Sequence, residues 1–136
     1  MPNPHQTLVQ KWLDEVWNKG NIEIAESLMH ENAIRHGIAE KDANEPGPSG
    51  FRKFYETFKK DFTNIDMEMD EAIKVDGHEA VRCTVHALHV PSNKKVDFTG
   101  ICWAKCDNGK ISEAWNSFDF LTMYRQIGYK LVQEQE

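Results

Sequence analysis

The chain has 136 residues, of which 40% are hydrophobic and 28% charged, and its formal net charge is −6. This length predicts one domain, residues 1–136, that buries about two-thirds of its unfolded surface. An acidic chain with scattered lysines argues against nucleic-acid binding, and no apolar run is long enough to cross a membrane.

The N-terminal half of the chain predicts three helices. Residues 7–18 carry hydrophobic side chains at helical spacing and are followed by Gly20, which suits a left-handed cap. Asn21 can cap a second, short helix, and residues 32–37 predict a brief strand. Ser49 can cap a third helix, whose aromatic stripe is typical of a core-facing helix. The stripe consists of Phe51, Phe54, Tyr55, Phe58 and Phe62.

Residues 38–48 separate the brief strand from the third helix. They contain two prolines, one glycine and four charged side chains, so they predict a loop. Loops of this length in small domains often form lids or pocket rims.

From Ile65 onward the hydrophobic period changes from that of a helix to that of strands. Turns are expected at Asp76-Gly77 and Asn108-Gly109, and residues 120–127 predict a last short helix. The expected strands are 65–70, 72–75, 79–90, 96–106 and 110–120. Helices first and an antiparallel meander afterwards predict an α+β fold with the helices on one face of the sheet.

Both faces of this sheet are partly apolar. In residues 96–106, Phe98 and Cys102 lie on one face, whereas Ile101 and Trp103 lie on the other. One face can meet the helices, and the other face is free to meet a second copy of the chain. We therefore expect a homodimer that forms through the open face of the sheet.

The cysteines predict free thiols. Cys83, Cys102 and Cys106 all fall in expected strands, and no pair has the Cys-x-x-Cys spacing of a metal or redox site. Cys102 and Cys106 would lie about 13 Å apart on one strand, which is too far for a disulfide. Free thiols and an N-terminus without a signal-peptide pattern lead us to expect a cytoplasmic protein.

Asp119 ends the last strand between Phe118 and Phe120. A carboxylate among aromatic side chains is desolvated, which raises its pKa and suits it to acid/base chemistry near neutral pH. Alternatively, Asp119 caps the turn that follows, in which case its pKa stays ordinary or falls.

Pairing counts outward from the turns suggest which residues share a face. A two-residue turn before the last strand pairs Phe98 with Asp119. In the preceding hairpin, a two-residue turn at Asn93-Lys94 pairs His89 with Phe98, whereas a longer loop puts His86 on that face instead. One of these histidines should then lie about 10 Å from Asp119 on a flat sheet, unless a β-bulge alters the count.

The remaining residues indicate neither a metal site nor a cofactor site. His86 and His89 are three residues apart on a strand, so they point to opposite faces and no metal is expected. A nucleophilic serine motif, a P-loop and a glycine-rich dinucleotide motif are absent from the sequence, and no cofactor is expected. His36, beside Gly37, is either a turn residue or a member of the pocket.

The order of several motifs resembles that of the SnoaL-like polyketide cyclases, which belong to the nuclear transport factor 2-like superfamily. The resemblance implies a cone-shaped fold, in which a strongly curved antiparallel sheet and about three helices enclose a deep pocket. The motifs are Glu15-Val-Trp-Asn-Lys-Gly-Asn21, Arg35-His36-Gly37, Gly50-Phe-Arg-Lys-Phe54, Arg82-Cys-Thr with His89, and Lys110-Ile-Ser-Glu-Ala-Trp-Asn-Ser-Phe-Asp119 with Gln126-Ile-Gly128.

The resemblance also implies roles for individual residues. An Asp at the position of Asp119 is the acid/base of an intramolecular aldol closure, and a His at the position of His89 lies in the pocket, which favours His89 over His86. Two departures suggest a different pocket mouth: residues 90–95 form a shortened hairpin, and the Gly-Thr-His of the family reads Ala87-Leu88-His89.

These inferences lead to a hypothesis of cofactor-independent acid/base catalysis on a small hydrophobic carbonyl compound, by cyclisation, isomerisation or dehydration. Asp119 and His89 are the expected catalytic residues. The expected substrate-binding residues are His36, Tyr55, Phe98, Trp103 and Trp115. The alternative is a non-catalytic module that binds a small ligand, with epoxide hydrolysis as a weaker third option.

Overall fold

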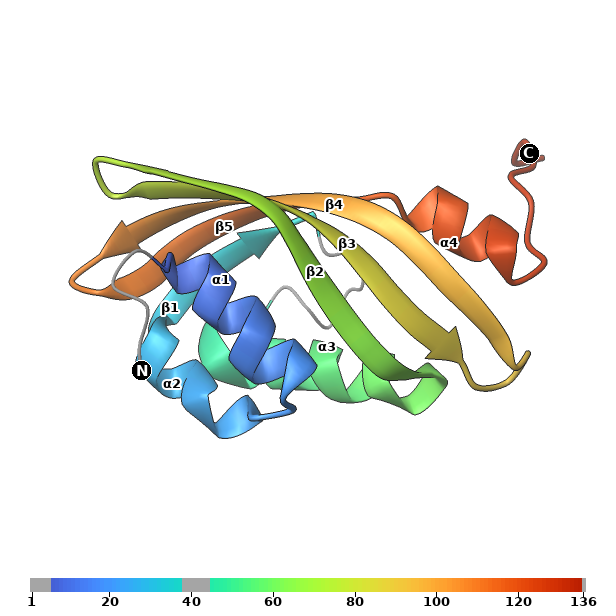
Figure 1. The fold of residues 1–136 in the computed structure, drawn as a ribbon, viewed down its shortest axis with the longest axis horizontal. Coiled ribbons are helices and arrows are strands. Elements are labelled where there is room, and N and C mark those ends of the chain that lie inside the picture. The colour runs from blue at the N-terminus through green and yellow to red at the C-terminus, as the bar shows by residue number, and fades with distance from the viewer. Residues whose placement is uncertain (1–5, 38–44, 136) are drawn as a thin grey trace.

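The computed structural model describes residues 6–37 and 45–135, which form the expected α+β fold (Figure 1). Its helices are α1 (Leu8–Trp12), the π-helix η1 (Leu13–Asn18), the 3-10 helix η2 (Ile22–Ile24), α2 (Ala25–Leu28), α3 (Gly47–Asp61) and α4 (Phe120–Gln126). Its strands are β1 (Met29–His36), β2 (Phe62–Val75), β3 (His78–His89), β4 (Lys94–Asp107) and β5 (Lys110–Phe118). None of the helices in the described ranges is both long and apolar enough to cross a membrane.

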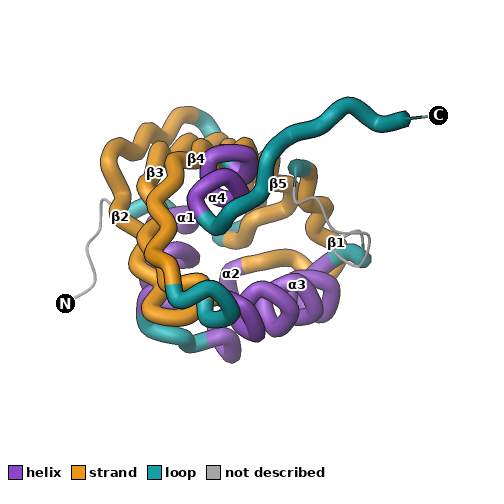
Figure 2. Tube along the Cα trace, turned by 90° about the vertical axis from the view of Figure 1, so that its right-hand side faces the viewer, coloured by secondary structure: helices purple, strands orange, loops and turns teal. Residues whose placement is uncertain are grey.

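The five strands form one curved sheet in the order β1-β5-β4-β3-β2. Strands β2 to β5 are antiparallel neighbours, as predicted, whereas β1 pairs in parallel with β5. The predicted antiparallel meander is therefore confirmed, and the edge strand β1 adds one parallel pair to it. The sheet arches over α1, α2 and α3, which lie on its concave side, and this confirms the predicted cone (Figures 1 and 2).

Several element boundaries differ from those predicted, including those of α3, β2 and β1. Helix α3 begins at Gly47, with a proline in its first turn, where the missing N–H costs no helical hydrogen bond. Strand β2 is continuous through Val75, and Phe62 is its first residue rather than the end of the helix. Strand β1 begins earlier than predicted, at Met29. The predicted rim loop falls mostly on residues 38–44, which lie outside the described part of the chain.

Aromatic packing joins the N-terminal helices to α3. The ring of Trp17 in η1 meets Phe51 and Phe58 edge-on, with centroid distances of 5.8 and 5.5 Å. Phe51 and Tyr55 are buried, which confirms that the aromatic stripe of α3 faces the core. These contacts hold the helices as one layer beneath the sheet.

A buried carboxylate fixes α1 against the sheet. Glu79 on β3 is 1% exposed, and its two oxygens accept hydrogen bonds from the backbone N–H groups of Leu8 and Val9, at 3.0 and 2.9 Å. These N–H groups belong to the first turn of α1, where no helical acceptor exists and negative charge is stabilising. Glu79 therefore sets the position of a helix that carries cavity-lining side chains.

A β-bulge changes the predicted register between β4 and β5. The Asn108-Gly109 turn forms as expected, but an irregularity follows it at Ser112 on β5. Gly100 consequently pairs with Phe118, and the prediction that Phe98 pairs with Asp119 is wrong. Because one extra residue inverts the facing of all residues beyond it, Asp119 does not share a face with Phe98.

The register between β3 and β4 also differs from the one chosen. A four-residue turn at 90–93 places His89 opposite Lys94, so that Val85 rather than His89 pairs with Phe98. The partner of Phe98 has moved by an even number of residues. His89 therefore still lies on the same face as Phe98, and His86 lies on the opposite face.

Candidate functional site

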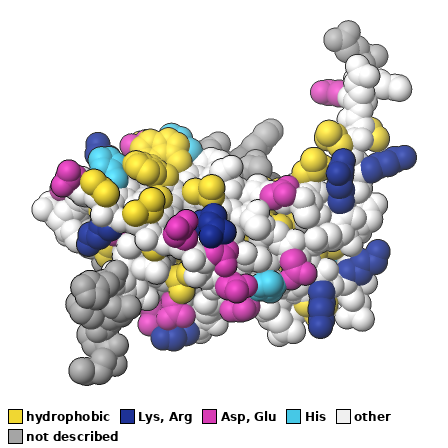
Figure 3. Space-filling view, turned by 45° about the horizontal axis from the view of Figure 1, so that its top comes forward, with side chains coloured by type: hydrophobic (Ala, Val, Ile, Leu, Met, Phe, Trp, Pro, Cys, Tyr) yellow, Lys and Arg dark blue, Asp and Glu magenta, His cyan; other side chains and the backbone are white. Residues whose placement is uncertain are grey.

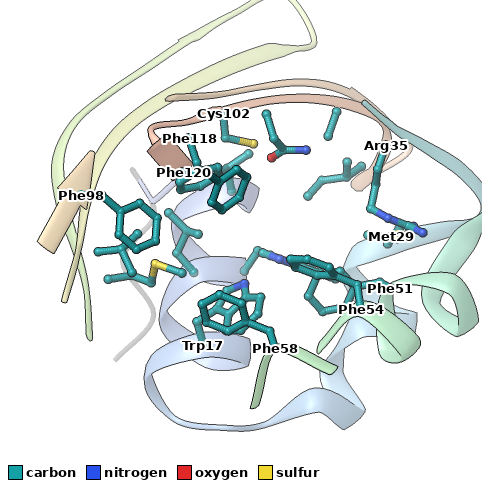
Figure 4. Close-up of a pocket in the computed structure, with 18 residues that line it drawn as sticks. Trp17, Met29, Arg35, Phe51, Phe54, Phe58, Phe98, Cys102, Phe118 and Phe120 are labelled. Carbon is teal, nitrogen blue, oxygen red and sulfur yellow. Dashed lines mark hydrogen bonds between the residues drawn. The ribbon is translucent and has the colours of Figure 1, made fainter. Parts of the chain in front are cut away.

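A cavity lies between the concave face of the sheet and the helices (Figure 4). Its empty volume is about 800 Å³, which includes solvent at its mouth. Eight aromatic side chains line it: Trp12, Trp17, Phe51, Phe54, Phe58, Phe98, Phe118 and Phe120. The other lining residues are Val9, Leu13, Met29, Arg35, Met67, Val85, Cys102, Ile111, Ala114 and Asn116.

The aromatic rings come from two opposite walls. Trp17 and Phe58 lie on the helical side of the cavity, and Phe98, Phe118 and Phe120 lie across from them (Figure 4). The centroids of Phe118 and Phe120 are 6.0 Å apart, and Phe98 lies 6.4 Å from Phe118. Such spacings are typical of interacting aromatic pairs, so the sheet side presents a connected aromatic surface.

Gly100 makes room for this aromatic surface. A Cβ atom at Gly100 would lie 2.1 Å from Cδ1 of Phe118, closer than any real contact. Phe118 can therefore lie over β4 only because its cross-strand partner has no side chain.

Arg35 is the charged member of the lining among the described residues. Its Nη1 donates to the carbonyl oxygen of Gly47 at 2.8 Å, and its Nη2 donates to the carbonyl oxygen of Glu45 at 2.6 Å. Burial lowers the pKa of this guanidinium, and the nearby carboxylate of Glu45 opposes that shift. Arg35 thus ties β1 to the start of α3 and brings positive charge to the cavity wall.

Asn116 is a second polar lining residue, and it joins β5 to the end of β1. Its Nδ2 donates to the carbonyl oxygen of His36 at 3.1 Å. Gly37 follows with a φ of +81°, and a Cβ there would lie 1.8 Å from the carbonyl oxygen of Asn116. Gly37 therefore permits both the left-handed turn and the close approach of its backbone to that of Asn116 on β5.

Asp119 lies outside the lining and caps α4. Its carboxylate accepts hydrogen bonds from the backbone N–H of Thr122 at 3.1 Å and from the Thr122 hydroxyl at 2.6 Å. These bonds hold the pKa of the exposed Asp119 carboxyl below its ordinary value. The expected rise in its pKa is wrong, and the alternative of a helix cap is confirmed.

His89 lies at the end of β3, also outside the lining. Its Nδ1 shares a hydrogen bond of 2.7 Å with the hydroxyl of Ser92. Its ring packs against Phe62 with a centroid distance of 5.1 Å. The structure thus does not bring His89 and Asp119 together with the lining of the cavity.

Of the five expected substrate-binding residues, Phe98 lines the cavity. Tyr55 is buried behind the lining, with its ring 5.0 Å from that of Trp17. His36, Trp103 and Trp115 lie on the outer face of the sheet: His36 stacks on Trp115 at 5.2 Å, and Trp103 is the cross-strand partner of Trp115.

Sequence reasoning missed Arg35 and Asn116, and among the aromatic residues of the helices it expected only Tyr55 to bind the substrate. Arg35 appeared in the quoted motifs, but alternation of Ile34 and Arg35 on a short strand favours an inward Ile34 and an outward Arg35, the opposite of the observed burial. No cluster of three or more His, Cys, Asp or Glu side chains suited to a metal ion occurs in residues 6–37 and 45–135.

Comparison with known proteins identifies the fold and the family. The chain superposes on a protein from Bacillus cereus ATCC 10987 that is named provisionally as a polyketide cyclase, with a TM-score of 0.80 and 26% identity over 91% of this chain and 80% of that one. It also superposes on TsrD from Streptomyces laurentii (TM-score 0.77, 17% identity, 93% and 98% coverage) and on IdmH from Streptomyces antibioticus, likewise named provisionally as a polyketide cyclase (TM-score 0.75, 22% identity, 88% and 95% coverage).

No protein of curated function matches the chain. The family model described as SnoaL-like polyketide cyclase matches residues 7–127, which include every strand and helix of the described structure. The chain therefore belongs to the SnoaL-like polyketide cyclase family.

Proposed function

We propose that the cavity binds a small hydrophobic compound without a cofactor. The observation that carries this proposal is the aromatic lining of the cavity. Its rings come from both walls of the cone, and membership of the SnoaL-like family accounts for the cone itself. Removing apolar surface from water stabilises a complex by about 25 cal/mol per Å², so aromatic rings on two sides favour a flat apolar ligand.

Calorimetric titration with naphthalene derivatives tests this proposal. Phe54→Ala removes a lining ring from a half-buried position and is expected to weaken binding by about tenfold or more. Trp103→Ala removes an exposed ring on the outer face and serves as the control. Binding that depends on Trp103 and not on Phe54 would place the ligand outside the cavity.

A second candidate is acid/base catalysis by Asp119 on a carbonyl compound, with His89 as a hydrogen-bond donor. It is favoured by the position of Asp119 between two lining residues, Phe118 and Phe120, in a family of polyketide cyclases. A low pKa keeps this carboxylate ionised at neutral pH and makes it a weak base. It would therefore suit an acidic C–H, such as that between two carbonyl groups.

Turnover of 1,3-dicarbonyl compounds by cyclisation, isomerisation or dehydration tests this candidate. Asp119→Asn is expected to lower the rate by about 10² or more while ligand affinity changes little, since Asp119 lies outside the lining. His89→Gln is expected to lower the rate less. A rate that survives in Asp119→Asn excludes Asp119 as the base.

We also propose that a second copy of the chain covers the outer face of the sheet. Four large apolar side chains there are 40–51% exposed, and hydrophobic side chains gather toward one end of this face (Figure 3). The four are Ile34, Ile101, Trp103 and Trp115. Light scattering should show a dimer that Trp103→Glu converts to a monomer, and a monomeric unmodified chain would contradict the proposal.

A cytoplasmic location is proposed on the basis of the cysteines. Cys83, Cys102 and Cys106 are free thiols, and two of them are buried. Free thiols are typical of reducing compartments. Fractionation of the source cells tests the location, and recovery of the protein outside the cytoplasm would overturn it.

A further inference from the structure

The segment that follows α4 is anchored at its first residues and free beyond them. The backbone N–H of Gly128, whose φ is +104°, donates to the carbonyl oxygen of Arg125 at 3.2 Å. The N–H of Tyr129 donates to the carbonyl oxygen of Tyr124 at 3.0 Å, and the two tyrosine rings pack edge-on at 5.6 Å, which completes a Schellman motif. Residues 130–135, which we call the strap, form no hydrogen bond or ion pair with the described residues and lead away from the body of the protein (Figures 1 and 2).

The chain is strongly apolar where it leaves α4. Tyr129, Leu131 and Val132 are 64%, 74% and 69% exposed, more than any other large apolar side chain among the described residues. Apolar surface is stabilised by removal from water, so these adjacent side chains favour a position against a second apolar surface.

Such a surface lies at the mouth of the cavity. Four of the eight aromatic rings in the lining are buried, and the other four are partly exposed and form its rim. The rim rings are Phe54 and Phe58 on α3, Phe118 at the end of β5 and Phe120 at the start of α4. Because α4 and the C-terminal end of α3 lie at the same end of the cone, the strap begins beside this rim (Figures 1 and 2).

The strap is long enough to cover the rim. Helix α4 has seven residues and is about 10 Å long at 1.5 Å per residue. An extended chain advances about 3.3 Å per residue, so Val132 can lie about 10 Å from the anchored Tyr129. A strap that turns back at Lys130 and runs alongside α4 therefore brings Val132 to the level of Phe120.

The apolar patch on the outer face of the same chain is too distant for these side chains. Gln126, at the end of α4, bonds through its side chain to the backbone of Asp97 on β4. Trp103 lies six residues farther along β4, or about 20 Å, which is twice the reach of Val132.

We propose that the strap closes over the mouth of the cavity when a ligand is bound. Closure buries Leu131 and Val132 against the rim rings and the ligand, which completes the apolar surface between the two sides of the mouth. The open position leaves a path for entry and release. This proposal rests on the proposed function, because a ligand must occupy the cavity, and it adds control of ligand exchange by the strap.

Limited digestion with trypsin tests closure on the unmodified chain. Lys130 is exposed in the open position, so trypsin should cut after it rapidly. Saturating 2-acetylnaphthalene, a flat apolar probe, should slow this cut about tenfold, while trypsin cleaves an added peptide at an unchanged rate. Equal rates with and without the probe would overturn closure. Protection that needs no probe and grows with protein concentration would also overturn it, because the strap would then bind a second copy of the chain.

Release rates assign the effect to the apolar side chains. Release of 2-acetylnaphthalene, measured by stopped-flow fluorescence, should be about tenfold faster from a chain that stops after Tyr129 and from the double variant Leu131→Ser/Val132→Ser. Gln133→Ser/Gln135→Ser is the matched control and should leave the rate unchanged. All three changes lie beyond the Schellman motif, at residues without bonds to the described chain, so the fold stays intact.

The outcomes separate the strap from the proposed function. Binding of the probe with the same release rate from all variants overturns the strap and leaves a cavity that binds apolar ligands. Calorimetry that shows no binding of the probe to the full chain or to the shortened chain contradicts the proposed function itself, and the strap proposal falls with it.

Discussion

Replacing Glu79 by Gln should destabilise the protein by about 2–4 kcal/mol. The carboxylate accepts two backbone hydrogen bonds at 3.0 and 2.9 Å from the first turn of α1, and it is 1% exposed. A glutamine oxygen can keep one bond, but its NH₂ group faces the other N–H. The variant therefore loses one charge-assisted bond, worth about 1.5–3 kcal/mol, and leaves a buried donor unsatisfied at a cost of about 1–3 kcal/mol, partly relieved by relaxation.

Urea denaturation at pH 7 measures this change. With a slope of about 1–3 kcal/mol per M, the midpoint should fall by about 1–2 M. Glu71→Gln is the matched control, because Glu71 is exposed and lies 3.7 Å from Arg82 on the sheet surface; its effect should stay within about 0.5 kcal/mol. An equally small effect of Glu79→Gln would refute the view that this carboxylate holds α1 in place.

Three further predictions concern titrating groups. His86 forms hydrogen bonds with Glu68 at 3.0 Å and with Asp97 at 2.5 Å, and these bonds raise its pKa. The stabilising contribution of His86 is therefore full below a pH of about 6.5 and is lost as the pH rises through the raised pKa. His86→Gln should therefore lower the free energy of unfolding more at pH 6 than at pH 9, and the opposite order would contradict the ion pairs. NMR titration should place the Asp119 carboxyl below its ordinary pKa, and Thr122→Val should raise that value; an unchanged midpoint in the variant would argue against the cap. Burial raises the pKa of the Cys102 thiol to about 12, so about 10⁻⁴ of this thiol is ionised at pH 8. Iodoacetamide should therefore modify Cys102 far faster after unfolding, and rapid modification of Cys102 in the native protein would contradict its burial.

The elements of the fold were predictable because hydrophobic periods report local structure. The aromatic stripe of residues 51–58 predicted a helix that faces the core, and the alternation after Ile65 predicted strands. The Asn108-Gly109 turn fixed the start of one hairpin. The parallel pairing of β1 with β5 could not be inferred, because a period shows which residues share a face but not which strand lies alongside.

Which residues line the site was harder to predict, because this depends on the side of the sheet to which each side chain points. One inserted residue reverses that side for every residue beyond it. The bulge at Ser112 carries no glycine that would have signalled it. It places Asn116 and Phe118 in the cavity, and Trp115 and Asp119 outside it. In the neighbouring hairpin the predicted pairing was also wrong, but by an even number of residues, so the facing of His89 was correct.

The most direct test of the cavity as the ligand site uses the four tryptophan indole N–H signals in a ¹⁵N NMR titration with 2-acetylnaphthalene. Trp12 and Trp17 line the cavity, whereas Trp103 and Trp115 lie on the outer face. Single Trp→Phe variants assign the four signals. We predict that the signals of Trp12 and Trp17 shift with saturation while those of Trp103 and Trp115 stay in place, and shifts confined to Trp103 and Trp115 would contradict a ligand site inside the cone.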